Sequence, residues 1–554
     1  MSVATNFQSK LKFLEQLPNE IFLEIFQYLN GVDITYGFSQ LNTRFQCLLI
    51  KWVNKFDFKS VTKDKFYYVI QHHNMHRWRS LCLCDDDKTP GQIRLFYQLF
   101  PLAENVSQLQ SLSILNMKPK FATDILSQLV SFNNLISLTV TTICGEDIPS
   151  FELPSLKRLV VTGCKCNDWI KKFYSLKSLE YTINYMCHYN CILTLPKTLQ
   201  QLQLIYNETR DGENLRISLC EMTQLIKLAL YDQGYYSPLP NGRKWEELIK
   251  SSLSLLKTFQ FCFHFVRYPN ESYDVNQAMA SFSTFFYLEE KRWFVRCDSN
   301  YLHSAEGVIY TLPFAFSQIR LDIKSYDMSI STLVTNNTDR RKYDSYHRIQ
   351  TLLLSTKCEM PQQGFLISNI VRLILKNDLP RSWYSLLKNV RHLEFQQHVC
   401  MSTNDFADFL EYAGQLQSLT LLTPALIQLT GSFKNKAVCD QLSKRIQSLT
   451  ISDCFSDTSC CQSLIYPELL SYIVNIFCNI CKHLSLNIVS FPKTTLPVFR
   501  NMQQLRSLHI YYPTWRDKSY STAITWFQQC IYEIDASDFI FTPDDGNFYV
   551  WIKS

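Results

Sequence analysis

Glycine is scarce in this chain, with 13 among 554 residues. Loops that cradle phosphate groups need glycine at fixed spacings, and the sequence contains neither Gly-x-x-x-x-Gly-Lys nor Gly-x-Gly-x-x-Gly. The Gly-x-Ser-x-Gly run of a nucleophile elbow is absent as well. These absences argue against a phosphate-cradling fold and against a hydrolase of that type.

Long apolar runs and a strong charge of one sign are also missing. No apolar stretch reaches the ~18 residues that a membrane helix needs, and the N-terminus has no apolar core of the signal-peptide kind. We therefore expect a soluble protein of the cytoplasm or nucleus, with no membrane partner, whose 20 cysteines are reduced thiols. A formal charge of +6 is small for this length, so it does not argue for nucleic acid as a partner.

Residue sets that carry metal or covalent chemistry are incomplete. Cys478-x-x-Cys481 with His483 is half of a zinc site, and no second cysteine pair stands at the usual spacing. His72 and His76 share one helical face but lack the glutamate of the metalloprotease motif. No nucleophile is placed beside a base. We expect no cofactor, no metal and no catalytic residue, and hence a chain that is not an enzyme.

What the sequence does contain is one repeated phrase. Apolar residues make up 46% of the chain, which suits a large core. From Trp78 on, the pattern apolar-x-x-apolar-x-apolar recurs, where x is any residue. The copies occupy 78–83, 109–114, 135–140, 156–161, 176–181, 199–204, 225–230, 256–261, 349–354, 370–375, 390–395, 416–421, 446–451, 481–486 and 505–510, with a doubtful one at 319–323.

The spacing of the phrase matches the period of leucine-rich repeats. In the tightest runs the copies start 20–23 residues apart. The last two apolar residues of each copy lie two apart, so they share one face of a short strand that only stacked copies can bury. Asn or Cys follows some copies at the usual place, as Cys164, Asn184, Asn207 and Cys454. The phrase predicts a leucine-rich-repeat-like solenoid of α/β class, with parallel strands on the concave side and helices or turns on the convex side.

The array divides into parts. We expect a first half at 78–262, an insertion at 263–318 where the rhythm fails, a second half at 319–512 and a C-terminal cap at 513–554. Strand-like runs at 291–297 and 308–312 with turn residues between them predict a hairpin-like insertion. Amphipathic stretches at 123–132, 245–255, 403–412 and 467–477 are the expected convex helices. Concave residues would form a region that holds a client protein, and its candidates are Arg158, Glu180, Gln203, Lys227, Arg372 and Glu394.

Two short helices are expected before the array, between residues 14 and 49. Pro18 suits the first turn of a helix whose apolar stripe includes Ile21, Ile25 and Leu29. Asn30-Gly31 stops this helix, and Asp33 is a candidate cap for the next. Two such helices cannot form a core alone, so their apolar stripe needs cover from the rest of the chain or from another protein.

This stretch resembles an F-box, in the spacing of that family. The resemblance lies in Leu17-Pro18-Asn19-Glu20-Ile21, Ile25-Phe26-Gln27-Tyr28-Leu29, Asp33-Ile34 and Asn42-Thr43-Arg44-Phe45. It implies a tail at 1–12, an F-box at 13–59 and a helical joint at 60–77. It also implies docking on the S-phase kinase-associated adaptor and, through it, on the cullin of an SCF-type ubiquitin ligase. The implied docking residues are Leu17, Pro18, Ile21, Ile25, Phe26, Leu29, Ile34 and Leu41.

Two other functions remain open at this point. The first is a scaffold for protein interaction outside any ligase, in which the F-box-like helices only cap the solenoid. The second is an enzyme whose chemistry lies in the aromatic-rich segment from Phe263 to Phe316. Under the F-box hypothesis the chain is a non-catalytic receptor subunit, and ubiquitin transfer is done by its partners.

Overall fold

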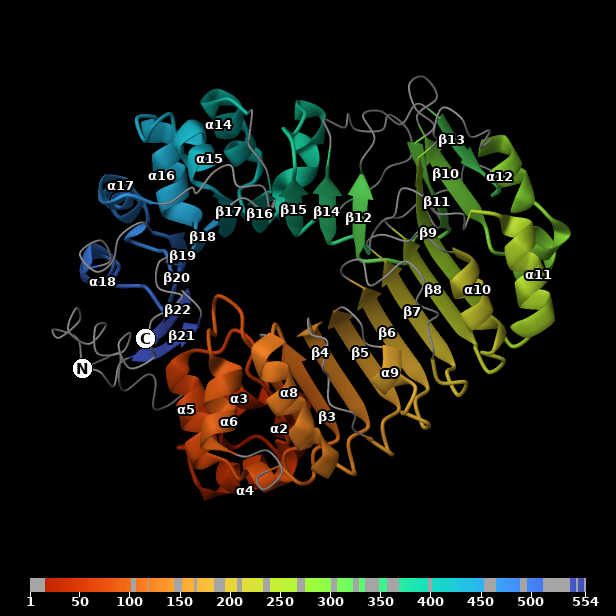
Figure 1. Cartoon of the computed structure of the whole chain (residues 1–554). Helices are drawn as coiled ribbons and strands as arrows, with labels where there is room; N and C mark the ends of the chain where they lie inside the picture. The colour runs from red at the N-terminus through yellow and green to blue at the C-terminus, as the bar shows by residue number, and fades with distance from the viewer. Residues whose placement is uncertain are drawn as a thin grey trace.

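Four N-terminal helices are joined to two arrays of mainly parallel strands. The arrays form two arcs of a ring, with further helices on the outside (Figure 1). The computed structural model describes residues 15–100, 106–117, 119–143, 152–163, 167–183, 195–206, 212–232, 240–266, 275–299, 306–321, 328–333, 348–355, 367, 369–396, 401–452, 465–488, 496–511, 539–544 and 547–552. The N-terminal helices are α2 (Asn19–Gln27), α3 (Gly31–Phe38), α4 (Thr43–Trp52) and α5 (Lys63–His72). Among the described residues no helix is both long and apolar enough to cross a membrane.

The first array is a 12-stranded sheet in which β1 to β9 are consecutive parallel neighbours. Its strands are β1 (Lys55–Asp57), β2 (Ser80–Cys84), β3 (Ser111–Leu115), β4 (Ser137–Ile143), β5 (Arg158–Gly163), β6 (Ser178–Ile183), β7 (Gln201–Tyr206), β8 (Lys227–Asp232), β9 (Thr258–Val266), β10 (Val295–Ser299), β11 (Glu306–Thr311) and β13 (Met328–Ser331).

The second array is a separate 10-stranded sheet, parallel from β12 through β14 to β20. Its strands are β12 (Gln318–Leu321), β14 (Thr351–Leu354), β15 (Arg372–Leu375), β16 (His392–Phe395), β17 (Ser418–Leu422), β18 (Ser448–Ser452), β19 (His483–Asn487), β20 (Ser507–Tyr511), β21 (Phe539–Asp544) and β22 (Asn547–Ile552). The predicted solenoid is therefore present, as two sheets rather than one.

Every copy of the predicted phrase coincides with a strand, and its apolar residues are buried. The doubtful copy is the real strand β12, in which Ile319 pairs with Leu352 of β14. One copy escaped the sequence analysis: Val53, Phe56 and Phe58 have the same spacing and are buried around β1. The first repeat thus begins inside the segment assigned to the F-box. Cys164, Asn184, Asn207 and Cys454 lie outside the described residues.

A row of backbone carbonyls joins the repeats where each strand begins. Each carbonyl accepts two N–H groups of the next repeat, as Lys157 O does from Lys177 N and Ser178 N, both at 2.9 Å. The same pattern starts at Asn54 O, which accepts from Arg79 N and Ser80 N. The last carbonyl with two such donors is Lys482 O, which accepts from Arg506 N at 2.7 Å and Ser507 N at 3.1 Å, and Arg506 O then accepts one N–H, that of Ile552 in the terminal hairpin. We call this row the carbonyl spine; it satisfies polar groups that the turns would otherwise bury.

Helices cover the outer, convex face of both sheets (Figure 1). The four predicted convex helices are α8 (Pro119–Gln128), α11 (Gly242–Ser252), α14 (Thr403–Tyr412) and α17 (Pro467–Phe477). Further helices include α6 (Gln92–Leu99), α9 (Asn167–Ile170), α10 (Gly212–Cys220), α12 (Val275–Ser281), η3 (Phe286–Lys291), η4 (Arg381–Asn389), α15 (Thr423–Leu429), α16 (Lys436–Arg445) and α18 (Leu496–Asn501). The short spacings leave room only for a turn or one turn of helix.

The insertion extends the first sheet instead of lying outside it. β10 and β11 form an antiparallel hairpin, β11 pairs with β9, and β10 pairs with β13. The chain then crosses to the face of the sheet opposite the helices. There Phe316 packs on Tyr231 of β8 at 5.0 Å between ring centroids, and Phe314 joins the same core. This aromatic cover ends the first sheet and starts the second.

The N-terminal helices meet the C-terminal hairpin. β22 pairs antiparallel with both β20 and β21, so a hairpin covers the edge of the last repeat. Trp551 of this hairpin is buried against Phe66 of α5, with 5.4 Å between ring centroids. The turn after β2 also reaches the second array, where Asp87 accepts hydrogen bonds from Thr450 and Ser507. The ring in Figure 1 is closed by these contacts.

Asn30 and Gly31 start α3 and fix it to β1. The Asn30 side chain accepts from Val32 N and from Asp57 N, each at 3.2 Å. Asn30, not Asp33, is therefore the cap of α3, which corrects the sequence prediction. Asp33 instead forms an ion pair with Lys65 at 2.5 Å.

We expect Gly31→Ala to lower the stability of the N-terminal helices. A Cβ at Gly31 would lie 2.1 Å from Lys55 O, so α3 must move away from β1. The cost should be about 2 kcal/mol, measured as a lower Tm and faster amide exchange in α3. Gly37→Ala is the matched control, because a Cβ at Gly37 of the same helix meets nothing within 4 Å; it should be neutral or stabilise by about 0.5–1 kcal/mol. Equal effects of both changes would contradict this account.

We expect Trp551→Ala to loosen the ring at its closure. Removing a buried tryptophan costs about 3–5 kcal/mol, and the loss should appear as faster amide exchange in α5 and β22. Trp383→Ala in η4 is the control, because this side chain is equally buried but lies within the second array. The control should increase exchange around η4 and leave α5 unchanged. Unchanged protection of α5 in Trp551→Ala would show that the contact does not hold the ends together.

Candidate protein-interaction surfaces

A cluster of phenylalanine rings holds the N-terminal helices together. Phe22 of α2 meets Phe45 of α4 edge-on at 4.7 Å between ring centroids, and Phe26 meets Phe38 of α3 at 5.3 Å. Phe22, Phe26 and Phe45 are buried. Because this cluster uses one face of α2, the opposite face of the helix is left without cover from the described chain.

The run Asn42-Thr43-Arg44-Phe45 has a structural role at the start of α2. Asn42 caps α4 by accepting from Phe45 N at 3.1 Å, and it donates to Glu15 at 3.0 Å. Arg44 donates to Asn19 Oδ1 at 2.8 Å and to the carbonyls of Glu15 and Leu17, and lies over the Phe22 ring. These contacts fix the segment around Pro18 relative to the helices.

Large apolar side chains lie exposed at Ile21 of α2, at Tyr28 and Leu29 directly after this helix, and at Trp52, the last residue of α4. The exposed fractions are 41% for Ile21, 84% for Tyr28, 43% for Leu29 and 51% for Trp52. We call these four residues the docking face. Single exposed apolar residues are ordinary, but several on neighbouring elements are typical of an interaction site.

A pocket of about 590 Å³ opens beside the docking face. Its lining includes Leu23, Phe26, Leu29, Ile34 and Trp52. The apolar lining comes from three helices, and the segment between α4 and β1 completes it. The pocket is wide enough to receive a side chain of a partner protein.

The eight residues of the F-box resemblance are placed differently from one another. Pro18, Ile21 and Leu29 are exposed, and Leu17, Ile25 and Leu41 are half-buried. Phe26 and Ile34 are 8% and 2% exposed, so they hold the helices together and reach a partner only through the pocket. The structure brings Phe26, Leu29 and Ile34 together there.

Tyr28 and Trp52 complete this surface and were not among the predicted site residues. Trp52 follows Phe45, Leu48 and Leu49 at helical spacing, which predicts a buried position. It is exposed because α4 ends at Trp52 and the chain turns away toward β1. The sequence offered no signal for this.

The candidate client residues occupy the sheet faces opposite the helices. Arg158, Lys227 and Arg372 are exposed, while Glu180, Gln203 and Glu394 are half-buried. Gln203 donates to Glu180 of the neighbouring strand at 3.2 Å. Arg372 pairs with Glu394 at 2.5 Å. The structure joins these two pairs but places them in different arrays.

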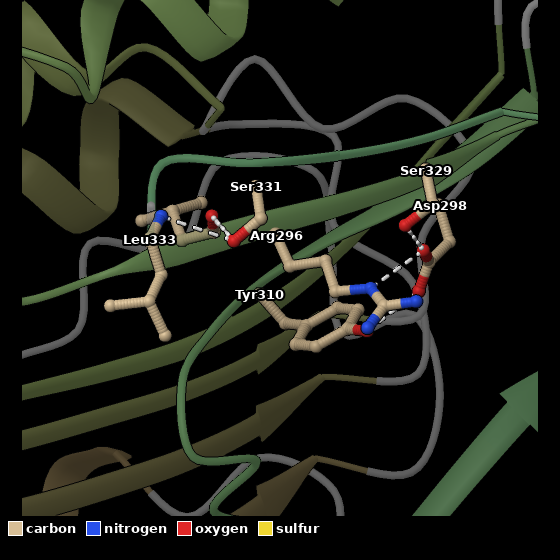
Figure 2. A network of polar contacts seen from close by, with 7 residues as sticks. Arg296, Asp298, Tyr310, Ser329, Ser331 and Leu333 are labelled. Atoms are coloured by element: carbon tan, nitrogen blue, oxygen red, sulfur yellow. Dashed lines mark hydrogen bonds and ion pairs between the residues drawn. The ribbon is translucent and has the colours of Figure 1, made fainter. Parts of the chain in front are cut away.

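The insertion, a candidate place for chemistry, contains a buried polar network (Figure 2). The Asp298 carboxylate accepts from Arg296 Nε at 2.9 Å, from Tyr310 OH at 2.6 Å and from Ser329 Oγ at 2.6 Å. These residues come from β10, β11 and β13. The network ties the three strands together, which is a structural role.

Two buried thiols, Cys84 and Cys481, and the half-buried imidazole of His483 stay uncharged at neutral pH. Burial raises the pKa of Cys84 and of Cys481 to about 12, so both thiols stay protonated. Burial, with Lys88 nearby, lowers the pKa of His483 to about 4, so this imidazole stays neutral. Cys481 donates to the carbonyl of His483 at 3.3 Å. Among the described residues no group of three or more His, Cys, Asp and Glu side chains is placed to hold a metal ion.

Comparisons with known proteins add little to this geometry. No protein-family model matches the sequence, and no curated protein matches it. A chain of the solved TLR13–ssRNA13 complex is 14% identical over 73% of this chain, with a TM-score of 0.23; the match spans about half, 54%, of the TLR13 chain. A leucine-rich-repeat protein of Leptospira interrogans is 13% identical over 82% of this chain and 88% of its own, with a TM-score of 0.21. The strand ladder of the chain itself carries the leucine-rich-repeat-like description.

We expect Asp298→Asn to destabilise the insertion by about 3 kcal/mol, because it leaves the Arg296 charge buried without its carboxylate. Ser329→Ala removes one hydrogen bond to the Asp298 carboxylate and leaves the ion pair intact, so it should cost about 1 kcal/mol. Urea denaturation of both variants measures the difference. A loss in Ser329→Ala as large as that in Asp298→Asn would contradict the assigned role of the ion pair.

Proposed function

We propose that this chain is the substrate-recognition subunit of an SCF-type ubiquitin ligase. Its N-terminal helices dock on the S-phase kinase-associated adaptor, and through it on the cullin, while the arrays hold a client protein. The observation that carries the proposal is the docking face: a stretch with F-box-like residues folds into helices whose apolar side chains remain uncovered.

The energetics of the docking face favour a partner. Burying one large apolar side chain fully is worth roughly 1.5–3 kcal/mol. The four residues of the docking face and the adjacent pocket therefore offer several kcal/mol to a protein that covers them. Exposed anchors beside a pocket are the arrangement of an interface hot spot.

The closed ring suits a receptor that positions its client. The N-terminal helices contact both the first strand and the last hairpin, since Gly31 packs on β1 and Phe66 on Trp551. The docking face is thus held at a fixed orientation to both arrays. In this function the chain contributes no reacting group, and its contribution to transfer is orientation.

A scaffold function outside any ligase is the alternative. It is favoured by the contacts of Gly31 with β1 and of Phe66 with Trp551, because through them the helices cover the first strand and the last hairpin. Under this alternative the docking face binds no adaptor.

Co-purification with the adaptor tests the proposal. We expect the double change Ile21→Glu and Leu29→Glu to abolish adaptor binding, lowering affinity at least a hundredfold, because two charges would be buried against an apolar partner. The Tm should stay close to that of the unchanged protein, since both side chains are exposed.

Ile217→Glu is the matched control. Ile217 is an equally exposed isoleucine on a helix, 53% exposed on α10 of the first array. This variant should bind the adaptor like the unchanged chain. Adaptor binding that persists in the double variant, or that is absent from the unchanged chain, would favour the scaffold alternative.

A further inference from the structure

Basic side chains gather along one edge of the first array. Lys157 and Arg158, Lys177, Lys227 and Lys257 stand where β5, β6, β8 and β9 begin, and all five are exposed. Because β5 to β9 are consecutive parallel neighbours, their starts share one edge of the sheet (Figure 1). We call these five residues the basic ridge.

The strand register places Arg158 and Lys227 in one row across the sheet, and Lys157, Lys177 and Lys257 each come one residue before that row. Arg158 pairs with Ser178, Ser178 with Gln201, Gln201 with Lys227 and Lys227 with Thr258. Neighbouring strands lie about 4.8 Å apart, so the ridge spans roughly 20 Å. An extended peptide of about six residues covers that length.

The charges of the ridge are not neutralised within the described chain. None of the five forms an ion pair with another described residue. Glu221 pairs with Lys197 at 3.2 Å and not with the ridge, while the half-buried Glu180 accepts a hydrogen bond from the neutral Gln203 amide and keeps its charge. No aspartate or glutamate stands at the first residue of any strand from β2 to β9 or at the residue before it, and all of these positions are described.

Exposed apolar side chains lie close in sequence to these cations. Ile226 is adjacent to Lys227, and Tyr174 and Leu255 lie in the turns that lead into β6 and β9. Tyr174 is the one exposed aromatic ring in the described turns that lead into β5 to β9, whereas a single-stranded nucleic acid is held by a row of such rings on which its bases stack. Cations with the exposed aliphatic side chains of Ile226 and Leu255 close by fit a peptide that carries both acidic and aliphatic side chains.

We infer that the basic ridge binds an acidic protein segment that also carries aliphatic residues. Calling that segment part of the client rests on the proposed function; the binding itself does not. The ridge narrows the candidate client region to one edge of β5–β9. It retains Arg158 and Lys227, and it leaves out Arg372 and Glu394, whose charges satisfy each other.

The test uses the full chain and a displayed library of random 12-residue peptides, twice the length that the ridge needs. We expect the unchanged chain to enrich peptides with several Asp or Glu residues and at least one Ile or Leu. The double variant Lys177→Glu and Lys227→Glu should lose this enrichment. The affinity of the double variant for one enriched peptide should be lower than that of the unchanged chain by roughly tenfold or more. Raising the ionic strength should lower the affinity of the unchanged chain by a similar factor.

Lys434→Glu with Lys436→Glu is the control, because it makes the same change in charge at two exposed lysines next to and within α16. This variant should bind the enriched peptide within twofold of the unchanged chain. Enrichment without acidic residues by the unchanged chain, or equal losses in the two double variants, would overturn the inference. So would tighter binding of a single-stranded oligonucleotide than of the peptide.

The two proposals fail separately. The ridge variant should still co-purify with the adaptor, and the variant changed at Ile21 and Leu29 should still bind the enriched peptide. Loss of adaptor binding alone contradicts the ligase function, and loss of acidic peptide preference alone contradicts the ridge.

Discussion

The carbonyl spine is the constraint on which the rest of this structure depends. Each turn into a strand leaves backbone N–H groups that need acceptors, and the preceding repeat supplies one carbonyl for two of them, as Lys157 O does for Lys177 and Ser178. This geometry keeps successive strands parallel and in register, so the leucines of the phrase meet in one core. It also sets side chains such as Lys177 and Lys227 on a common edge, where the basic ridge forms.

Closure gives the ring a property that an open solenoid lacks. The first and last units of an open array contact one neighbour each, so its ends need caps. Here Trp551 from the last hairpin packs on Phe66 of the N-terminal helices, and Asp87 reaches Thr450 and Ser507 of the second array. The N-terminal helices therefore contact both the first strand and the last hairpin of the ring, and the docking face stays exposed. A structural role and a docking role are compatible because they use opposite faces of the same helices.

The insertion shows how a repeat array can change direction. Its hairpin continues the first sheet with antiparallel strands, and the Asp298 network fixes those strands in place. Phe314 and Phe316 then cover the face of β8 and β9 opposite the helices, which lets a second sheet start from the other side. Two arcs result from one kind of repeat.

Much of the local structure could be derived from the sequence alone. The phrase located the strands of both arrays, because an apolar pattern of fixed spacing has few ways to be buried. The stripe of Ile21, Ile25 and Leu29 likewise placed the first helix, but the side of it that the chain buries is that of Phe22 and Phe26. The tertiary structure decided what depends on distant parts of the chain: that the array is two sheets, that Trp551 closes the ring, that Asn30 rather than Asp33 caps α3, and that Trp52 lies exposed beside a pocket. The physical reason is that periodicity reports which face of an element is buried, whereas which neighbour buries it depends on contacts between residues hundreds of positions apart.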